Sequence, residues 1–260
     1  MRQILLFLIP GAILASVLVN AADPTIDSIF TDNSNYNPTE NSTTAIRVDF
    51  NVTDFDGIGD LNNAACKCEF DNSMTWQSLY ETAADTACDN TTINENTTQY
   101  TCQVNMQFWY QATNYSINIT IADTSATVTN ASKTFVYNQL VASSIDLATI
   151  NFGTLSISDF GTNKTDINSP TLLTNTGNVN LSLNITGAAL TTGSSSINTN
   201  QFYADIDSTI DAALQLIVGS QQISGALVPA EDSTPGGNTE EVWWFADTSN
   251  SLQQCTYIGA

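Results

Sequence analysis

The sequence predicts an all-β protein of two antiparallel β-sandwich domains that follow an N-terminal signal peptide. Three observations lead to this prediction. Apolar and polar residues alternate in many short segments, turn-forming residues separate these segments, and an apolar leader opens the chain. Alternation with a period of two directs one set of side chains to a core and the other set to water.

Residues 1–22 have the three parts of a secretory signal peptide. Arg2 supplies a basic start, an apolar run extends from Ile4 to Val19, and Ala21-Ala22 offers small residues for cleavage. The run is short for a spanning helix and contains Pro10, so an uncleaved anchor is the less favoured alternative. No second apolar segment reaches spanning length. We therefore expect no transmembrane helix in the mature chain and an extracellular or cell-surface location.

Residues 23–138 are expected to form the first sandwich. Seven short segments alternate and are separated by turn clusters, one of them at Asp89–Thr98, which is typical of two packed sheets. The predicted strands are Thr25–Phe30, Ala45–Val52, Asn63–Phe70, Met74–Tyr80, Tyr100–Tyr110, Tyr115–Ala122 and Ala126–Tyr137.

Residues 139–260 are expected to form the second sandwich, with loops at Gly187–Asn200 and Glu231–Asn238 and one short helix within Asp207–Leu216. A hairpin predicted to begin at Asp247–Gln254 leaves no room for a returning strand before Ala260. Either the domain or gene product is short, or a strand from a neighbouring subunit completes the open edge. The predicted strands are Ile145–Phe152, Thr171–Thr174, Val179–Thr186, Gln201–Asp205, Leu214–Val218, Gln222–Val228 and Glu241–Phe245.

The composition excludes several classes of function. A formal net charge of −21 repels nucleic acid and anionic membranes, so neither is expected as a partner. The chain has no histidine, and this removes Ser–His and Cys–His catalytic pairs and histidine metal ligands. Asp205, Asp207 and Asp211 lie close in sequence, which keeps a carboxylate-dependent hydrolase as an alternative to a solvated acidic loop.

Four of the five cysteines, Cys66, Cys68, Cys88 and Cys102, fall in the first predicted domain and suggest two disulfides in an exported chain. Cys66 and Cys68 point to the same side of one predicted strand, where a direct bond would be strained. We therefore expect each of them to pair with Cys88 or Cys102. Cys255 is left as a free thiol or an intermolecular bridge. Zinc is disfavoured because the spacing is Cys-x-Cys and histidine is absent.

The chain has ten Asn-x-Ser/Thr sequons, and those on predicted strands lie on the polar side of the alternation. Polar residues take these positions with or without a glycan, so the pattern indicates exposure. Given export to a compartment with the machinery, we expect glycosylation. The acceptors are Asn41, Asn51, Asn90, Asn96, Asn114, Asn118, Asn130, Asn163, Asn180 and Asn184.

A turn rich in acid and glycine, Asp54-Phe55-Asp56-Gly57-Ile58-Gly59-Asp60, is the one candidate metal site. Carboxylates of Asp54, Asp56 and Asp60 are hard oxygen ligands that suit Ca²⁺. The alternative is a turn in which Asp accepts backbone N–H bonds and Gly supplies a positive φ. No other cofactor is expected.

Aromatic residues offer a second candidate function. Trp243 and Trp244 could stack on sugar rings, and a carbohydrate-binding module predicts at least one exposed tryptophan among these two, Trp76 and Trp109. Tyr100 stands two residues before Cys102, as in the tyrosine corner of antibody-like sandwiches, although a strand-end aromatic bonded to backbone is the simpler interpretation.

Two stretches of the first domain carry a family resemblance. They are the run from Pro24 through Ala45–Val52 to Leu61 and the segment Asn114–Asp123, followed by Phe135–Asn138. Both resemble immunoglobulin-like modules of archaeal cell-surface proteins. Leu173–Gly187, which contains Asn-Thr-Gly-Asn, is similar to a strand pair of extracellular adhesion sandwiches. The resemblance implies immunoglobulin-like β-sandwiches at a cell surface and transfers no catalytic residues; the early stop at Ala260 departs from it.

These observations predict a secreted or cell-surface structural or adhesive protein that acts through sandwich surfaces and sheet edges without catalysis. The expected partners are other surface-protein subunits or extracellular glycans. An extracellular carbohydrate-binding module is the first alternative, and the carboxylate-dependent hydrolase is the second.

Overall fold

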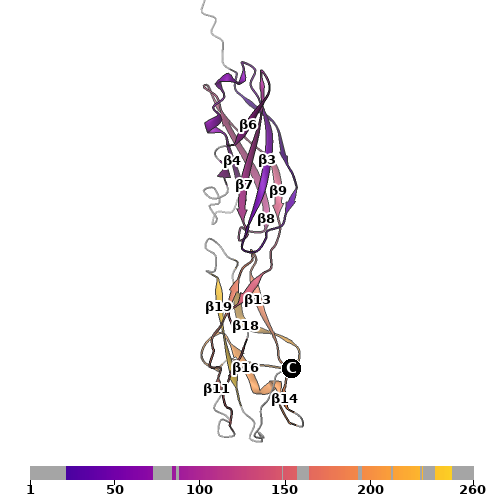
Figure 1. Cartoon of the computed structure of the whole chain (residues 1–260), viewed down its shortest axis with the longest axis vertical. Coiled ribbons are helices and arrows are strands. Elements are labelled where there is room, and N and C mark those ends of the chain that lie inside the picture. The colour runs from indigo at the N-terminus through magenta and orange to yellow at the C-terminus, as the bar shows by residue number, and fades with distance from the viewer. Residues whose placement is uncertain are drawn as a thin grey trace, which may run out of the picture.

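The computed structural model describes residues 22–72, 84–85, 88–147, 149–156, 164–192, 195–211, 213–228, 230 and 238–247 (Figure 1). In these ranges the regular structure is β-strands and the short 3-10 helices η1 (Ile58–Asp60), η2 (Asn63–Ala65) and η5 (Thr199–Gln201). The all-β prediction is confirmed. No helix in this part of the chain has the length and hydrophobicity of a membrane span.

The first nine strands form two sheets, which we call the N-terminal unit. One sheet has the order β1-β3-β7-β6 and the other β2-β9-β8-β4-β5. The neighbours are antiparallel, apart from β2, which runs parallel to β9. The strands are β1 (Thr25–Thr31), β2 (Asn35–Tyr36), β3 (Thr43–Thr53), β4 (Lys67–Asp71), β5 (Ala84–Asp85), β6 (Asp89–Asn94), β7 (Thr97–Gln107), β8 (Thr113–Ala122) and β9 (Thr127–Tyr137).

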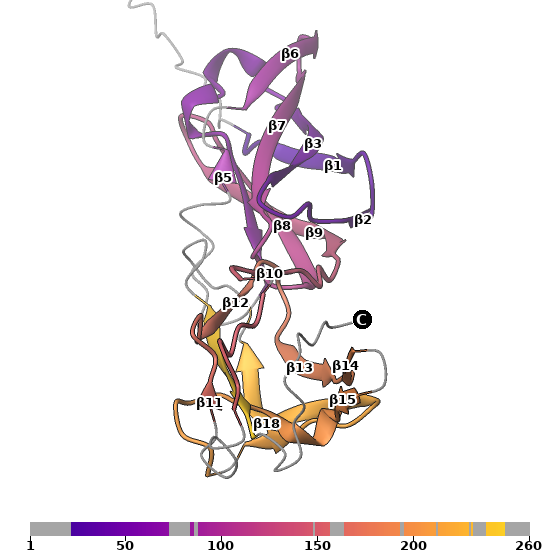
Figure 2. The same ribbon diagram turned by 60° about the horizontal axis from the view of Figure 1, so that its bottom comes forward.

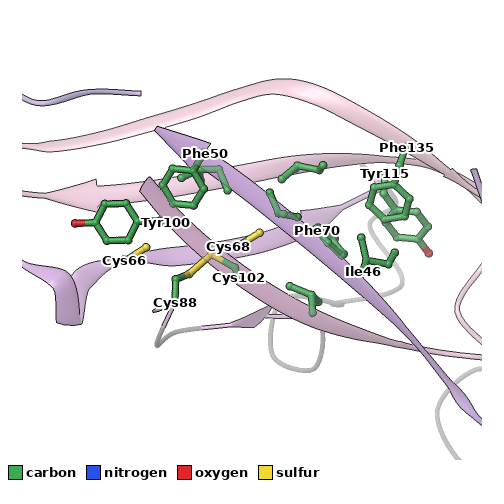
Figure 3. Packing of buried hydrophobic residues seen from close by; sticks show 14 of the residues in the cluster. Ile46, Phe50, Cys66, Cys68, Phe70, Cys88, Tyr100, Cys102, Tyr115 and Phe135 are labelled. Carbon is green, nitrogen blue, oxygen red and sulfur yellow. A yellow bond between two sulfur atoms is a disulfide. The ribbon is translucent and has the colours of Figure 1, made fainter. Parts of the chain in front are cut away.

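The core of the N-terminal unit lies between the inner faces of these sheets (Figure 3). Phe50 of β3 stacks on Tyr100 of β7 with the ring centroids 5.3 Å apart, and Phe135 of β9 packs on Phe70 and Tyr115. Truncating a side chain as well buried as these to Ala typically costs about 3–5 kcal/mol. The apolar side chains that alternate along these strands therefore hold the two sheets together.

The structure differs from the predicted strands in two places. The turn cluster at Asp89–Thr98 contains strand β6, because its residues pair along β7 despite a composition of Asp, Asn and Thr. Strand β4 begins at Lys67, since η2 occupies the first part of the predicted Asn63–Phe70 strand. The predicted strand Met74–Tyr80 lies outside the described residues.

The remaining strands form the C-terminal unit, which shares no sheet with the first. Six strands make one sheet with the order β10-β12-β19-β16-β17, in which β11 also pairs with β19; β13 pairs with β18, and β14 with β15. A second core lies where Ile185 of β13 and Ala226 of β18 meet the larger sheet. The strands are β10 (Ser143–Ile145), β11 (Lys164–Thr165), β12 (Thr171–Asn175), β13 (Leu181–Thr186), β14 (Leu190–Thr192), β15 (Ser195–Ile197), β16 (Phe202–Asp205), β17 (Leu214–Gln215), β18 (Ser220–Val228) and β19 (Thr239–Ala246).

The predicted helix at Asp207–Leu216 is wrong. The Asp207 carboxylate accepts the backbone N–H of Thr209 at 2.7 Å, a local bond that competes with helical hydrogen bonding, and the segment ends in strand β17. The loop expected at Gly187–Asn200 contains the β14–β15 hairpin. The predicted strand Ile145–Phe152 is reduced to the end of β10.

The two units lie end to end in an elongated molecule (Figures 1 and 2). The Asn178 side chain joins them. The Asn178 amide nitrogen donates to the carbonyl oxygens of Tyr110 and Asn138, each at 3.0 Å, and its amide oxygen accepts the Leu140 N–H at 2.6 Å. The Thr176 hydroxyl donates to the Glu40 carboxylate. These bonds fix the connecting segment against both units.

Gly177 allows the backbone of this segment to lie close to the backbone of Leu140. A Cβ atom at Gly177 would lie 2.2 Å from the Leu140 carbonyl oxygen, a distance that real contacts do not reach. Asn175, which is fully buried, accepts the Gly177 N–H at 2.9 Å and donates to the carbonyl oxygens of Val179 and Val228. Within the Asn-Thr-Gly-Asn segment, Asn175 therefore stabilises the turn, and Asn178 stabilises the junction between the units.

Asn178→Ala should loosen the junction while both units stay folded, because it removes three hydrogen bonds worth about 0.5–1.5 kcal/mol each. We expect small-angle X-ray scattering to give a broader distance distribution than for the native chain, with an unchanged circular dichroism spectrum. Asn184→Ala, on an exposed position of β13, is the control. Scattering curves that coincide for the two variants would contradict the role of Asn178.

Candidate functional site

Three carboxylates meet at one end of the N-terminal unit. Asp54 follows β3 of one sheet, Asp123 follows β8 of the other, and Asp60 ends η1 between them. One carboxylate oxygen from each lies within 4.8 Å of those of the other two. The cluster therefore spans both layers of the sandwich.

Backbone hydrogen bonds bring these residues together. The Asp54 N–H donates to the Asn96 carbonyl at 2.8 Å, and the Asn62 N–H donates to the Ala122 carbonyl at 2.8 Å. Gly57 precedes η1 with a φ of 112°, a conformation that L side chains rarely adopt. The turn can then reverse direction and return Asp60 toward Asp54.

Two oxygens of the cluster have no hydrogen-bond partner. Asp54 is fully buried, and neither its Oδ2 nor the buried Oδ1 of Asp60 is hydrogen bonded. Burial, together with the neighbouring Asp56 carboxyl, raises the pKa of Asp54 to about 7. Asp123 differs, because its Oδ1 accepts the N–H groups of Ser125 at 2.6 Å and Ala126 at 2.5 Å.

The sequence-predicted set was Asp54, Asp56 and Asp60, and the described cluster contains only the first and last of these. The Asp56 Oδ2 accepts the Ala22 N–H at 3.0 Å, while the Asp56 N–H donates to Asp54 Oδ1 at 3.3 Å. Asp123 is the third carboxylate of the cluster. Sequence reasoning missed it because it lies far along the chain, although its place between two predicted strands marks it as a turn acid.

A second acidic cluster, Asp205, Asp207 and Asp211, lies in the C-terminal unit and again has carboxylate oxygens within 4.8 Å. Asp205 and Asp207 border a hollow of about 380 Å³. Hydrogen bonds from the Thr209 hydroxyl and N–H lower the pKa of Asp207, which keeps it ionised and unsuited to act as a general acid. The Thr209 hydroxyl oxygen also lies 2.5 Å from Asp211 Oδ1, so its single hydrogen is shared between the two carboxylates. Asp207 and Asp211 thus lie on an exposed, hydrogen-bonded turn, whereas Asp205 is buried and its Oδ2 has no hydrogen-bond partner.

The cysteines pair differently from the expectation. The structure joins Cys88 to Cys102, because Cys88 immediately precedes β6 and the β6–β7 register sets it across from Cys102. The predicted pairing of Cys66 and Cys68 with these residues is corrected: both are buried thiols (Figure 3). The Cys66 sulfur nevertheless lies within 4.8 Å of both disulfide sulfurs. Cys255 lies outside the described residues.

None of the nine described sequon asparagines is buried. Five are exposed, namely Asn41, Asn90, Asn114, Asn180 and Asn184, and four are half-buried, namely Asn51, Asn96, Asn118 and Asn130. The Asn130 amide nitrogen donates to the Ile26 carbonyl at 3.2 Å, and the Asn51 amide oxygen is enclosed without a hydrogen-bond partner. Asn163 lies outside the described residues. Glycan occupancy stays a prediction.

The described tryptophans are all half-buried. The Trp244 indole N–H donates to the Thr171 hydroxyl at 2.9 Å, and that of Trp243 donates to Glu241 at 3.3 Å. Trp109 borders a hollow of about 440 Å³ beside the sequon residue Asn41. Trp76 lies outside the described residues. The carbohydrate-binding module predicts at least one exposed tryptophan, and none of the three described tryptophans is exposed.

The tyrosine hydroxyls also differ from the sequence interpretation. The Tyr100 hydroxyl donates to the Asn63 side chain at 2.6 Å, not to backbone. Tyr115, near the start of β8, instead donates to the Gln111 carbonyl four residues upstream at 3.0 Å.

Comparison with known proteins finds no protein-family model and no curated protein that matches this chain.

The disulfide is expected to stabilise the N-terminal unit. It closes a loop between residues 14 apart, which corresponds to about 3 kcal/mol of chain entropy removed from the unfolded state. Cys88→Ala/Cys102→Ala should lower the free energy of unfolding in urea by about this amount. The double change also prevents Cys66 from capturing a freed sulfur. Equal midpoints for the native chain with and without reductant would contradict the prediction.

Glycan occupancy in the native product should follow exposure. We expect glycans at the five exposed acceptors and none at Asn51 or Asn130, because their amides are engaged or enclosed in the folded chain. Peptide mapping by mass spectrometry measures this, with chymotrypsin or Glu-C as protease because the chain has only five Lys and Arg. A fully occupied Asn130 with an unmodified Asn90 would reverse the expected order.

Proposed function

We propose that the chain is an exported structural or adhesive protein of a cell surface, that it has no catalytic role, and that it binds other protein subunits through sandwich surfaces and a sheet edge. The leader and the sequons support export, and the high negative charge disfavours nucleic acid and anionic membranes as partners. The elongated arrangement of two units on a hydrogen-bonded junction is suited to a structural element.

The observation that carries the proposal is the distribution of exposed apolar side chains. Eleven large hydrophobic residues are exposed in the described chain, and eight of them lie in the C-terminal unit. Four of the eight, from Val141 to Ile150, lie on or beside strand β10, and exposed apolar residues that cluster mark contact surfaces. These eight are Val141, Ile145, Leu147, Ile150, Ile167, Ile217, Val218 and Leu227.

Strand β10 is the sheet edge that we expect to pair with another subunit. It is the first strand of the six-stranded sheet, all three of its residues are exposed, and Ile145 is 61% exposed. An exposed edge strand is a template for pairing with another chain. Strands β6 and β13 differ, because each carries exposed sequon asparagines, Asn90 on β6 and Asn184 on β13. Glycans there would obstruct an approaching strand, whereas no sequon lies on β10.

We further propose that the N-terminal unit is immunoglobulin-like. If its strands are lettered along the chain as A, A′, B, C, C′, D, E, F and G, the sheet orders become A-B-E-D and A′-G-F-C-C′. Immunoglobulin sandwiches pair their strands in this order, and they often carry a tyrosine whose hydroxyl binds backbone a few residues upstream, as Tyr115 does. The Cys88–Cys102 bond departs from that pattern, because it stays within one sheet's β6–β7 region.

Association of the purified mature protein tests the proposed function. We expect concentration-dependent oligomers in light scattering and electron microscopy, and we expect Ile145→Lys/Leu147→Lys to abolish them by placing charge on the β10 edge. The matched control is Ile93→Lys on edge strand β6, which is 54% exposed. A native chain that stays monomeric at all concentrations, or a control variant that is equally disruptive, would refute the role of β10.

A further inference from the structure

We propose that Asp54, Asp60 and Asp123 bind one Ca²⁺ ion that ties the two sheets of the N-terminal unit together at one end. This inference is independent of the proposed surface function. It starts from the positions of the three ligands. Asp54 continues from β3, Asp123 continues from β8, and these strands belong to opposite sheets.

The spacing of the carboxylates fits a shared ion. Ca²⁺ binds oxygens at about 2.3–2.6 Å, so two ligands of the same ion lie at most about 5 Å apart. One oxygen from each of the three side chains satisfies this limit, with all separations within 4.8 Å. The Asp56 carboxylate is not part of this set.

The unpartnered oxygens are the independent evidence for a ligand. A buried carboxylate oxygen without a hydrogen bond is costly, so native proteins pair such groups or coordinate a cation. Asp54 is fully buried with Oδ2 unpartnered, and Asp60 Oδ1 is also buried and unpartnered. The described ion pairs, Arg47–Asp49 and Lys67–Glu69, use other carboxylates. A divalent cation provides the missing positive charge.

The chemistry selects calcium over softer or smaller ions. The ligands are hard oxygens, and no histidine exists in the chain to hold a transition metal. Mg²⁺ demands a near-ideal octahedron and retains several waters, whereas Ca²⁺ accepts an irregular set of 6–8 oxygens, roughly. Carboxylates from two turns and a strand end form an irregular set, and Ca²⁺ accepts such a set with water in its remaining positions.

A shared proton is the competing way to relieve the buried carboxylates. It requires no metal, and it predicts no uptake of Ca²⁺ at pH 8. The two explanations therefore differ in a direct binding measurement on the same protein.

The test is a titration of CaCl₂ into the metal-free mature chain at pH 8, followed by isothermal calorimetry, native mass spectrometry and thermal unfolding. We expect one Ca²⁺ bound with a higher melting temperature, and at least tenfold weaker binding in Asp54→Asn and in Asp123→Asn. Asp123 is only partly buried, so its variant tests the site even if Asp54→Asn fails to fold. MgCl₂ should bind at least tenfold more weakly than CaCl₂.

The matched control is Asp207→Asn/Asp211→Asn in the second acidic cluster, which should bind Ca²⁺ with a Kd within twofold of the native value. Absence of Ca²⁺ uptake by the native chain would overturn the proposal in favour of a shared proton. Unchanged binding in a folded Asp123→Asn variant would overturn it as well, and loss of binding in the control variant would move the site to the second cluster. Equal affinity for Mg²⁺ would overturn the selection of calcium.

Discussion

Contact between the apolar inner faces of two sheets positions most other features of the N-terminal unit. Phe50 and Tyr100 belong to one sheet, and Phe70, Tyr115 and Phe135 belong to the other; all five are excluded from solvent. Because successive residues of a strand point to opposite sides, burying this set forces the alternate residues outward. The sequon asparagines of β3 and β8 lie outside the core for this reason, and the acids that follow these strands meet at the end of the sandwich.

The chain stabilises its turns with side-chain oxygens and amides more than with ion pairs. Asp123 and Asp207 each accept neighbouring N–H groups, and Asn178 performs the same task across the unit junction. With five basic residues against 26 acids, such bonds are the available means of fixing a turn without positive side chains. The Asp54 cluster leaves two buried carboxylate oxygens, Asp54 Oδ2 and Asp60 Oδ1, without a hydrogen-bond partner, and an added cation would satisfy them.

The two units differ in how completely they bury apolar surface. The N-terminal unit encloses large aromatic and branched side chains, whereas the C-terminal core is smaller and leaves most of the exposed hydrophobic residues. A unit with little core of its own gains stability when another surface covers its apolar residues. In the proposed function, the hydrogen-bonded junction would hold the contact-forming C-terminal unit at a defined distance from the N-terminal unit.

The amino-acid sequence by itself determined the all-β class, most strands of the N-terminal unit and the outward direction of the sequon residues, because a period of two identifies the face on which a side chain lies. It could not identify which segments are neighbours. The Cys88–Cys102 pair, the β6 strand and the replacement of Asp56 by Asp123 were decided by strand pairing between distant segments. Asn178 is the clearest case: its sequence position indicates only a turn, and its three bonds exist because tertiary structure brings Tyr110, Asn138 and Leu140 around it. The local alternation of apolar and polar residues fixes the face of the sheet on which a side chain lies. The partner of that side chain depends on long-range packing, which the alternation does not encode.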